Sequence, residues 1–119
     1  MNGIFLNTVK VEWPRGEDRI MNILEDFVFI DKNGLEWRAP AGSSIDGASI
    51  PKFFWRVIGS PFIGLYREPS VIHDVYCQTK SRPAQDTHDC FLEMMKANKV
   101  EPERAQTMYN AVNNFGPRW

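Results

Sequence analysis

The period of the hydrophobic pattern changes near position 50, and this change limits the fold more than any other feature of the chain. Before it, residues 22–30 and 35–39 are rich in strand formers and partly alternate between apolar and polar side chains. After it, apolar residues recur at helical spacing, as at Phe91, Met94 and Met95. Strands first and helices afterwards are typical of an α+β fold.

A β-hairpin is predicted within the first part of the chain. Asn33-Gly34 separates the two strand-like runs, and this dipeptide is a strong signal for a tight hairpin turn because both residues tolerate positive φ. A further strand is expected at residues 8–13. The sequence therefore predicts a small antiparallel sheet within a β-rich segment at residues 1–42.

Prolines mark the expected starts of the helices, since proline fits the first turn of a helix. Ser81 is the expected N-cap of the third helix. The connection between the second and third helices is short, so these two helices are expected to be antiparallel. The expected helices lie within a helical segment at residues 50–116, and residues 1–119 are expected to form a single domain. The predicted helices are 52–58, 70–78, one that follows Ser81, has Pro83 in its first turn and runs to about Asn98, and 102–115.

Charge and composition exclude several classes of protein. The chain has 119 residues and a formal net charge of −1, which provides no electrostatic attraction to nucleic acid. No apolar stretch is long enough to span a bilayer. Residues 1–7 lack the features of a signal peptide, so a cytoplasmic location is expected. Cys77 and Cys90 are too few for a disulfide scaffold and match no zinc ribbon, so both are expected to be buried thiols.

The adjacent pair His73-Asp74 is the first candidate for chemistry. Neighbouring residues on a helix point about 100° apart, so the two side chains serve different partners. His73 would face the next, antiparallel helix, which carries Asp86, His88 and Asp89. Asp86 or Asp89 would then accept a hydrogen bond from His73 and orient it as a general base.

Asp74 would face the loop that contains Asp46-Gly47. Two facing carboxylates repel unless a cation or a proton lies between them. Calcium takes six to eight oxygen ligands, which Asp46, Asp74, carbonyls near Gly47 and water could supply. The alternative is that Asp46-Gly47 is an ordinary turn and that the His-Asp pair is structural. No nucleophile elbow surrounds any serine in residues 43–49, so no serine nucleophile is predicted.

Four segments carry a resemblance to a known family. "SSIDGASIPKFFW", "VIHDVY", "SRPAQD" and "MYNAVNNFG" occur in this order within residues 27–116. In this order they resemble a family of small proteins from phage and prophage genomes that is classified as a domain of unknown function. That resemblance implies no particular activity.

The same segments are more distantly similar to bacterial secreted phospholipase A₂, through Asp-Gly-x-Ser, His-Asp and Tyr-x-Ala-Val-x-x-Phe-Gly. This resemblance implies that His73 is the general base, and that Asp74 and Asp46 bind calcium with a backbone carbonyl at or beside Gly47. It also implies an acid on the antiparallel helix that orients the histidine. The chain departs from that pattern at Cys77, where the phospholipases have tyrosine.

Two functions remain open on this basis. One is a calcium-dependent hydrolase of an ester or an amide, for which a lipid substrate is implied only by the phospholipase resemblance. Two positions are open for the acid that would orient His73. Counting forward from Arg82 places it at Asp86. Counting back from Phe91 places it at His88, with Asp89 beside it. The alternative is a non-catalytic phage accessory protein that binds and inhibits a host protein, or a virion component.

Overall fold

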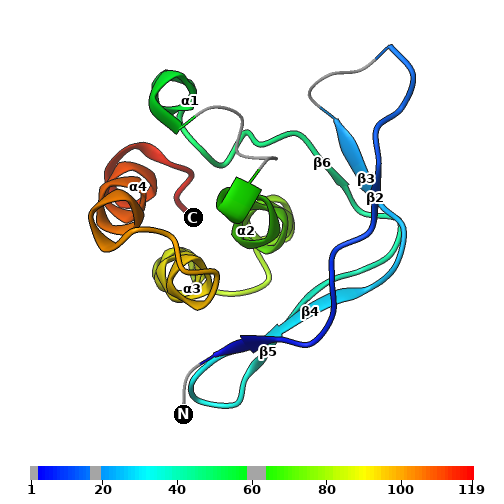
Figure 1. Cartoon of the computed structure of the whole chain (residues 1–119), viewed down its shortest axis with the longest axis horizontal. Helices are drawn as coiled ribbons and strands as arrows, with labels where there is room; N and C mark the ends of the chain where they lie inside the picture. The colour runs from blue at the N-terminus through cyan, green and yellow to red at the C-terminus, as the bar shows by residue number, and fades with distance from the viewer. Residues whose placement is uncertain (1–2, 17–19, 59–63) are drawn as a thin grey trace.

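The computed structural model describes residues 3–16, 20–58 and 64–119, in which short strands precede the helices (Figure 1). This order confirms the predicted α+β fold. The strands are β1 (Ile4–Phe5), β2 (Val11–Glu12), β3 (Met21–Ile23), β4 (Phe27–Ile30), β5 (Glu36–Ala39) and β6 (Ser44–Ile45). The helices are α1 (Lys52–Ile58), the 3₁₀ turn η1 (Gly64–Tyr66), α2 (Arg67–Thr79), α3 (Ala84–Ala97) and α4 (Pro102–Phe115).

The described strands form two small antiparallel sheets, with strand orders β1-β4-β5 and β2-β3-β6. The hairpin of β4 and β5 pairs Phe29 with Trp37. Gly34 closes its turn with φ of 83°, and its N–H donates to the carbonyl of Asp31 at 2.9 Å. The predicted Asn33-Gly34 hairpin is therefore confirmed.

The strand-like run at residues 22–30 does not form one continuous strand. That run is divided between β3 and β4, which lie in different sheets. At the break, the Asp26 carboxylate accepts hydrogen bonds from the backbone N–H of Ala41 and from the Arg38 guanidinium, both at 2.7 Å. Met21 then pairs with Ile45 while Phe27 pairs with Ala39, so strand partners far along the chain decide where the run divides.

The helices lie close to where their prolines predict them. The helix α2 begins at Arg67, three residues before the predicted start, and α4 has the predicted bounds. Ser81 is not the N-cap of α3, because Pro83 occupies that position without a side-chain hydrogen bond. The Ser81 hydroxyl instead lies 3.1 Å from Thr79 Oγ1.

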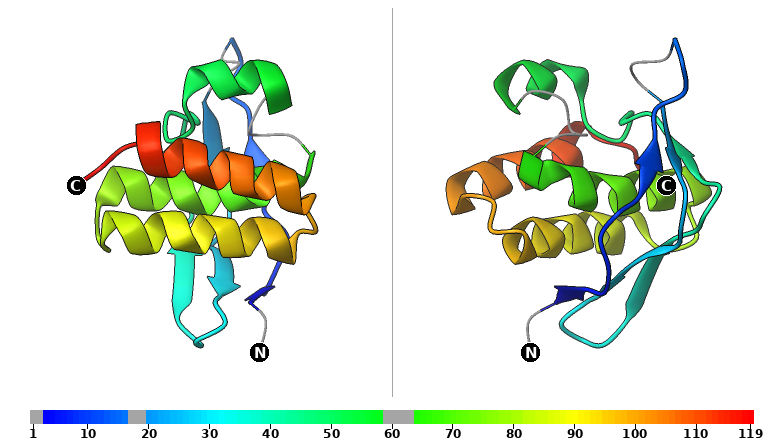
Figure 2. Two further views of the ribbon diagram at one scale, coloured as in Figure 1. Left: turned by 90° about the vertical axis from the view of Figure 1, so that its left-hand side faces the viewer. Right: turned by 45° about the vertical axis from the view of Figure 1, so that its right-hand side comes forward.

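The helix α3 packs against both α2 and α4, and it runs antiparallel to α2 (Figure 2). One core cluster joins the strands to α2 and includes Phe27, Trp37 and Ile72. A second joins α3 to α4 and includes Phe91 and Met108. Polar side chains at the seam of α2 and α3 are therefore shielded from water. Among the described helices, none has the length and apolar character needed to cross a bilayer.

Candidate metal centre

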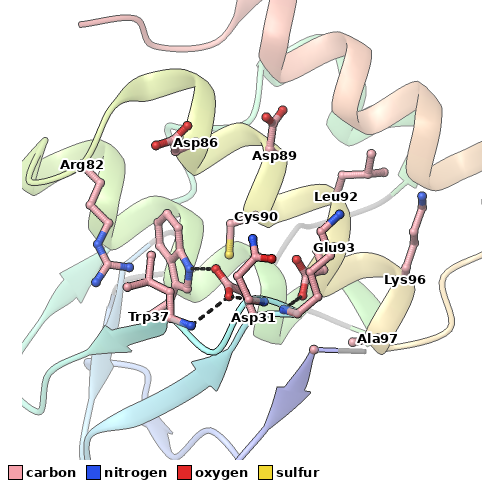
Figure 3. A pocket seen from close by; sticks show the side chains of 14 residues that line it. Asp31, Trp37, Arg82, Asp86, Asp89, Cys90, Leu92, Glu93, Lys96 and Ala97 are labelled. Carbon is pink, nitrogen blue, oxygen red and sulfur yellow. Dashed lines mark hydrogen bonds between the residues drawn. The ribbon is translucent and has the colours of Figure 1, made fainter. Parts of the chain in front are cut away.

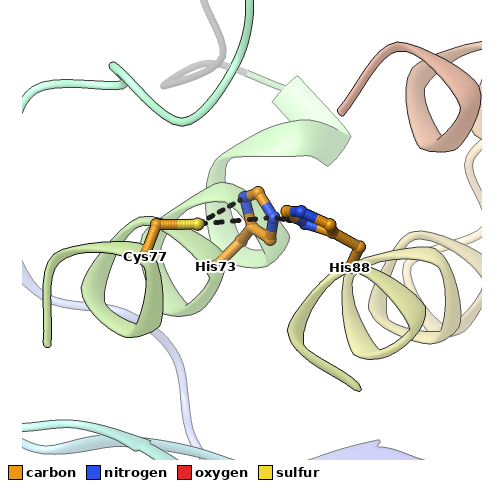
Figure 4. Close-up of side chains that lie close together, drawn as sticks. All are labelled: His73, Cys77 and His88. Atoms are coloured by element: carbon orange, nitrogen blue, oxygen red, sulfur yellow. Dashed lines mark hydrogen bonds between the residues drawn. The ribbon is translucent and has the colours of Figure 1, made fainter. Parts of the chain in front are cut away.

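Two histidines and a cysteine meet where α2 packs against α3 (Figure 4). His73 and Cys77 are four residues apart on α2, a spacing that places both side chains on one face of a helix. His88 comes from the face of α3 that also carries Phe91 and Met95, three and seven residues later. Helical periodicity thus brings three metal-binding side chains to one buried contact between the helices.

The three side chains are close enough to share one ion. His73 Nε2 lies 2.9 Å from His88 Nδ1, and Cys77 Sγ lies 3.7 Å from His73 Nε2. One ligand atom from each residue falls within 4.8 Å of the others. Both histidines are 0% exposed and Cys77 is 7% exposed. Both cysteines of the chain are buried and free, as predicted.

Each histidine has a second polar partner on its far side. His73 Nδ1 lies 3.1 Å from Ser49 Oγ, and the His73 ring stacks on Phe91 with centroids 4.5 Å apart. His88 Nε2 lies 3.0 Å from the carbonyl oxygen of Pro117. The outer nitrogen of each ring is therefore hydrogen-bonded, and the inner nitrogens face each other.

Asp74 points away from this cluster, toward the loop of Asp46 and Gly47. Its carboxylate accepts hydrogen bonds from the backbone N–H groups of Asp46 and Ser49, both at 3.2 Å, and from Gln78 Nε2 at the same distance. The exposed carboxylate of Asp46 accepts the N–H of Ala48 at 2.9 Å, and Gly47 has φ of 74°.

The chain thus brings Asp74 to the predicted loop, but the loop presents N–H groups to the Asp74 carboxylate. A cation bound there would have to displace these donors, since calcium binds oxygen atoms. The calcium assignment of Asp46, Gly47 and Asp74 stays a prediction.

Asp86 and Asp89 lie on the other side of α3 from the histidine pair. They line an open cleft of about 710 Å³ that also contains Arg82 and Glu93 (Figure 3). Asp89 accepts hydrogen bonds from Tyr109 Oη at 2.6 Å and from Gln85 Nε2 at 2.9 Å. His88 is the residue that meets His73 Nε2. The catalytic assignment of the two acids stays a prediction.

Burial determines the protonation of the cluster. Burial, and secondarily the neighbouring His88, lowers the pKa of His73 to about 3. Burial also lowers the pKa of His88, and it raises the pKa of Cys77 to about 12 with a further contribution from Asp74. Near neutral pH, both imidazoles are therefore neutral and able to bind a metal, whereas the thiol must lose its proton to do so.

Acidification below about pH 6.5 should destabilise the metal-free protein, because unfolding allows His73 to become charged. The folded pKa of about 3 lies below the unfolded value of 6.5, so this stabilising contribution is complete above the unfolded value and is lost as the pH falls toward the folded value. We expect the free energy of unfolding to fall by about 1.4 kcal/mol per pH unit in this window. Urea denaturation with EDTA would measure it. His73→Gln should flatten the dependence, and an unchanged slope in that variant would contradict the assignment.

Sequence reasoning did not assign Cys77, His88 and Ser49 to one site. The four-residue spacing of His73 and Cys77 was a usable signal, as was the position of His88 on the apolar stripe of α3. Ser49 and Pro117 carry no such signal, because they lie 24 residues from His73 and 29 residues from His88. Only the tertiary structure brings them to the two rings.

The fold and this cluster define an α+β protein with a buried His/Cys site between two antiparallel helices. Residues 21–112 match the family described as "Protein of unknown function (DUF1353)", and the chain belongs to this family. It is 51% identical over 100 residues to "Uncharacterized protein y4jT" of Sinorhizobium fredii, covering 84% of this chain and 30% of that protein. It is 39% identical over 94 residues to "Uncharacterized protein y4iH" of the same organism, covering 79% of this chain and 39% of that protein.

The chain thus spans about a third of the length of these curated relatives, 30% and 39% respectively. No solved structure matches the chain.

Proposed function

We propose that this chain binds a divalent transition-metal ion, with Zn²⁺ the best fit, between α2 and α3. The observation that carries the proposal is the convergence of His73, Cys77 and His88 within 4.8 Å in a buried seam. Two imidazole nitrogens and one thiolate are a ligand set that suits zinc. Calcium and magnesium prefer oxygen ligands.

The hydrogen bonds around the two rings support a cation between them. The Pro117 carbonyl can only accept, so His88 Nε2 carries a proton and Nδ1 has a free lone pair. The Ser49 side chain also acts on Asp74, since it partly offsets the burial that raises the pKa of that carboxyl group. In one His73 tautomer, Nδ1 donates to the Ser49 oxygen and Nε2 has a free lone pair; in the other, Ser49 donates to Nδ1 and Nε2 donates to His88 Nδ1. The first tautomer is the one that binds a metal, because it directs two lone pairs, 2.9 Å apart, toward a shared cation.

Two of the three distances between ligand atoms are close to those of a tetrahedral zinc site, and the third, between Cys77 Sγ and His88, lies within 4.8 Å. Zinc bonds of about 2.0 Å to nitrogen and about 2.3 Å to sulfur place two nitrogen ligands about 3.3 Å apart, and nitrogen and sulfur about 3.5 Å apart. Cys77 Sγ is already 3.7 Å from His73 Nε2. The two imidazoles need to separate by only a few tenths of an ångström from their 2.9 Å contact.

Metal binding should be visible as a stabilisation of the folded protein. Chelator-treated protein would be titrated with Zn²⁺, Co²⁺ and Ca²⁺ and followed by thermal unfolding. We expect about 4 kcal/mol of stabilisation when free Zn²⁺ is about 1,000 times its dissociation constant. Co²⁺ should add a thiolate charge-transfer band in the near ultraviolet. Absence of both effects would overturn the metal proposal, and a shift with Ca²⁺ alone would favour the oxygen site at Asp46 and Asp74 instead.

Hydrolysis of an ester or an amide is the activity that we propose for the loaded site. It requires α2 and α3 to separate enough to admit water and substrate, because both histidines are 0% exposed. Three protein ligands leave one coordination position of a tetrahedral zinc ion for water, as in catalytic zinc sites. Zinc supplies a Lewis acid that lowers the pKa of such a water to about 7. His73 is then a metal ligand, whereas in the calcium arrangement it is the general base.

A panel of activated esters, amides and phospholipid vesicles would test this activity with zinc-loaded protein. We expect ester turnover that EDTA abolishes, that Zn²⁺ restores and that His88→Ala removes. A protein that binds zinc stoichiometrically and hydrolyses nothing in the panel would instead support the non-catalytic alternative, in which the ion stabilises a domain that binds a host or phage protein.

A further inference from the structure

We infer that Ser49 is a positioning residue of this metal site, linking His73 to Asp74 so that the loop at residues 46–49 sets the affinity for the ion. This inference rests on the proposed metal site and adds an assignment for a residue outside the ligand set. It concerns the outer nitrogen of His73, which does not itself touch the ion.

Ser49 contacts both members of the His73-Asp74 pair. Its hydroxyl oxygen lies 3.1 Å from His73 Nδ1, and its backbone N–H donates to Asp74 Oδ1 at 3.2 Å. Its side chain also acts on Asp74, since it partly offsets the burial that raises the pKa of that carboxyl group. Ser49 is 2% exposed, so water does not compete for these bonds. One buried serine therefore connects the imidazole to a carboxylate.

The backbone around Ser49 holds it in this position. Gly47 has φ of 74°, a conformation that glycine adopts without strain. The N–H of Ile50 donates to the Gly47 carbonyl at 3.1 Å, and Ile50 is 1% exposed within the core cluster of α3 and α4. Asp46 donates its backbone N–H to Asp74 on the other side. The loop is thus fixed at both ends, and Ser49 is fixed with it.

Such a partner matters to a metal-binding histidine. A ligating imidazole donates its other N–H to a carboxylate, a carbonyl or a water, which fixes the tautomer and makes the ligating nitrogen more basic. For His73 that acceptor is Ser49, backed by the charge of Asp74. For His88 it is the Pro117 carbonyl. Of these two acceptors only Ser49 is a side chain, so only this one is removed by substitution.

Ser49→Ala tests the inference, with Ser70→Ala as a matched control. Ser70 is also a buried serine and lies on α2 itself, and among the described residues its hydroxyl has no hydrogen-bond partner. Zn²⁺ affinity would be measured by competition with a chelating dye. The Co²⁺ spectrum of each variant and the His73 tautomer, from ¹⁵N NMR of metal-free protein, would be recorded alongside.

We expect Ser49→Ala to bind Zn²⁺ about 10–100-fold more weakly, with a changed Co²⁺ spectrum and a loss of the protonated His73 Nδ1. Ser70→Ala should keep wild-type affinity, and Ser49→Thr, which keeps the hydroxyl, should restore binding if Ser49→Ala folds poorly. Wild-type affinity and an unchanged tautomer in Ser49→Ala would overturn the inference and leave the metal site standing. Failure of the wild type to bind Zn²⁺ or Co²⁺ would overturn both.

Discussion

Replacing Cys77 with alanine should weaken Zn²⁺ binding by about 100-fold. Structural zinc sites with four ligands bind with about 10–16 kcal/mol, so one ligand contributes about 3 kcal/mol, which is roughly 100-fold in affinity. Cys77 supplies the one sulfur of the cluster, 3.7 Å from His73 Nε2. Chelator competition would measure the loss, and the thiolate-to-cobalt band should disappear with it.

Cys90→Ala is the matched control for this substitution. Cys90 is also buried and free, but it belongs to the core cluster that faces the strands and is absent from the metal-binding group. It should therefore keep wild-type affinity and the cobalt band. Equal losses in the two variants would indicate a general packing effect and contradict the assignment of Cys77.

The pH dependence of binding provides a second measure of the same thiol. Burial raises the pKa of Cys77 to about 12, so a metal ion must displace its proton at neutral pH. His73 stays neutral there because its pKa is about 3. Wild-type affinity for Zn²⁺ should therefore rise about tenfold per pH unit between about pH 7 and about pH 9, and Cys77→Ala should lack this dependence.

Asp74→Ala should destabilise the fold by about 3 kcal/mol, independently of any metal. The Asp74 carboxylate is 2% exposed and accepts the backbone N–H groups of Asp46 and Ser49. Each buried donor that is left unsatisfied costs about 1–3 kcal/mol. Burial raises the pKa of Asp74, so the cost of a buried charge offsets part of this loss. Denaturation followed by tryptophan fluorescence, with EDTA present, would measure the difference.

Asp46→Ala is the control on the same loop. The Asp46 side chain is exposed and accepts one local hydrogen bond, from the N–H of Ala48, so its removal should cost less than about 1 kcal/mol. Similar losses for the two substitutions would show that the loop does not depend on the α2 carboxylate. A Ca²⁺-dependent stability that both substitutions abolish would instead support the calcium arrangement.

Local signals predicted the helices and the hairpin well. Pro102 and Gly116 bracket α4, and Asn33-Gly34 forms the turn between β4 and β5. These signals act through the conformational limits of single residues, so neighbouring sequence is enough to interpret them. The division of residues 22–30 between two sheets was not predictable in this way. It depends on strand partners such as Ile45 and Ala39, which lie elsewhere in the chain.

For the candidate site as well, local signals predicted some features and missed others. Helix spacing places His73 and Asp74 in different directions, and the structure has His73 against α3 and Asp74 against the loop of Asp46. Helix spacing also separates His88, on the apolar stripe, from Asp86 and Asp89, which face the open cleft. The residue of α3 that lies against His73 Nε2 is His88, which shares the buried face of α3 with Phe91 and Met95.

By itself, the sequence determined which side chains share a helix face, because an α-helix turns by the same angle at every residue. His73 with Cys77, and His88 with Phe91, follow from that rule. Only the tertiary structure decided that these two faces meet each other, and that Ser49 and Pro117 reach the outer nitrogens of the rings. Those contacts join segments distant along the chain, and the packing of both core clusters brings them together.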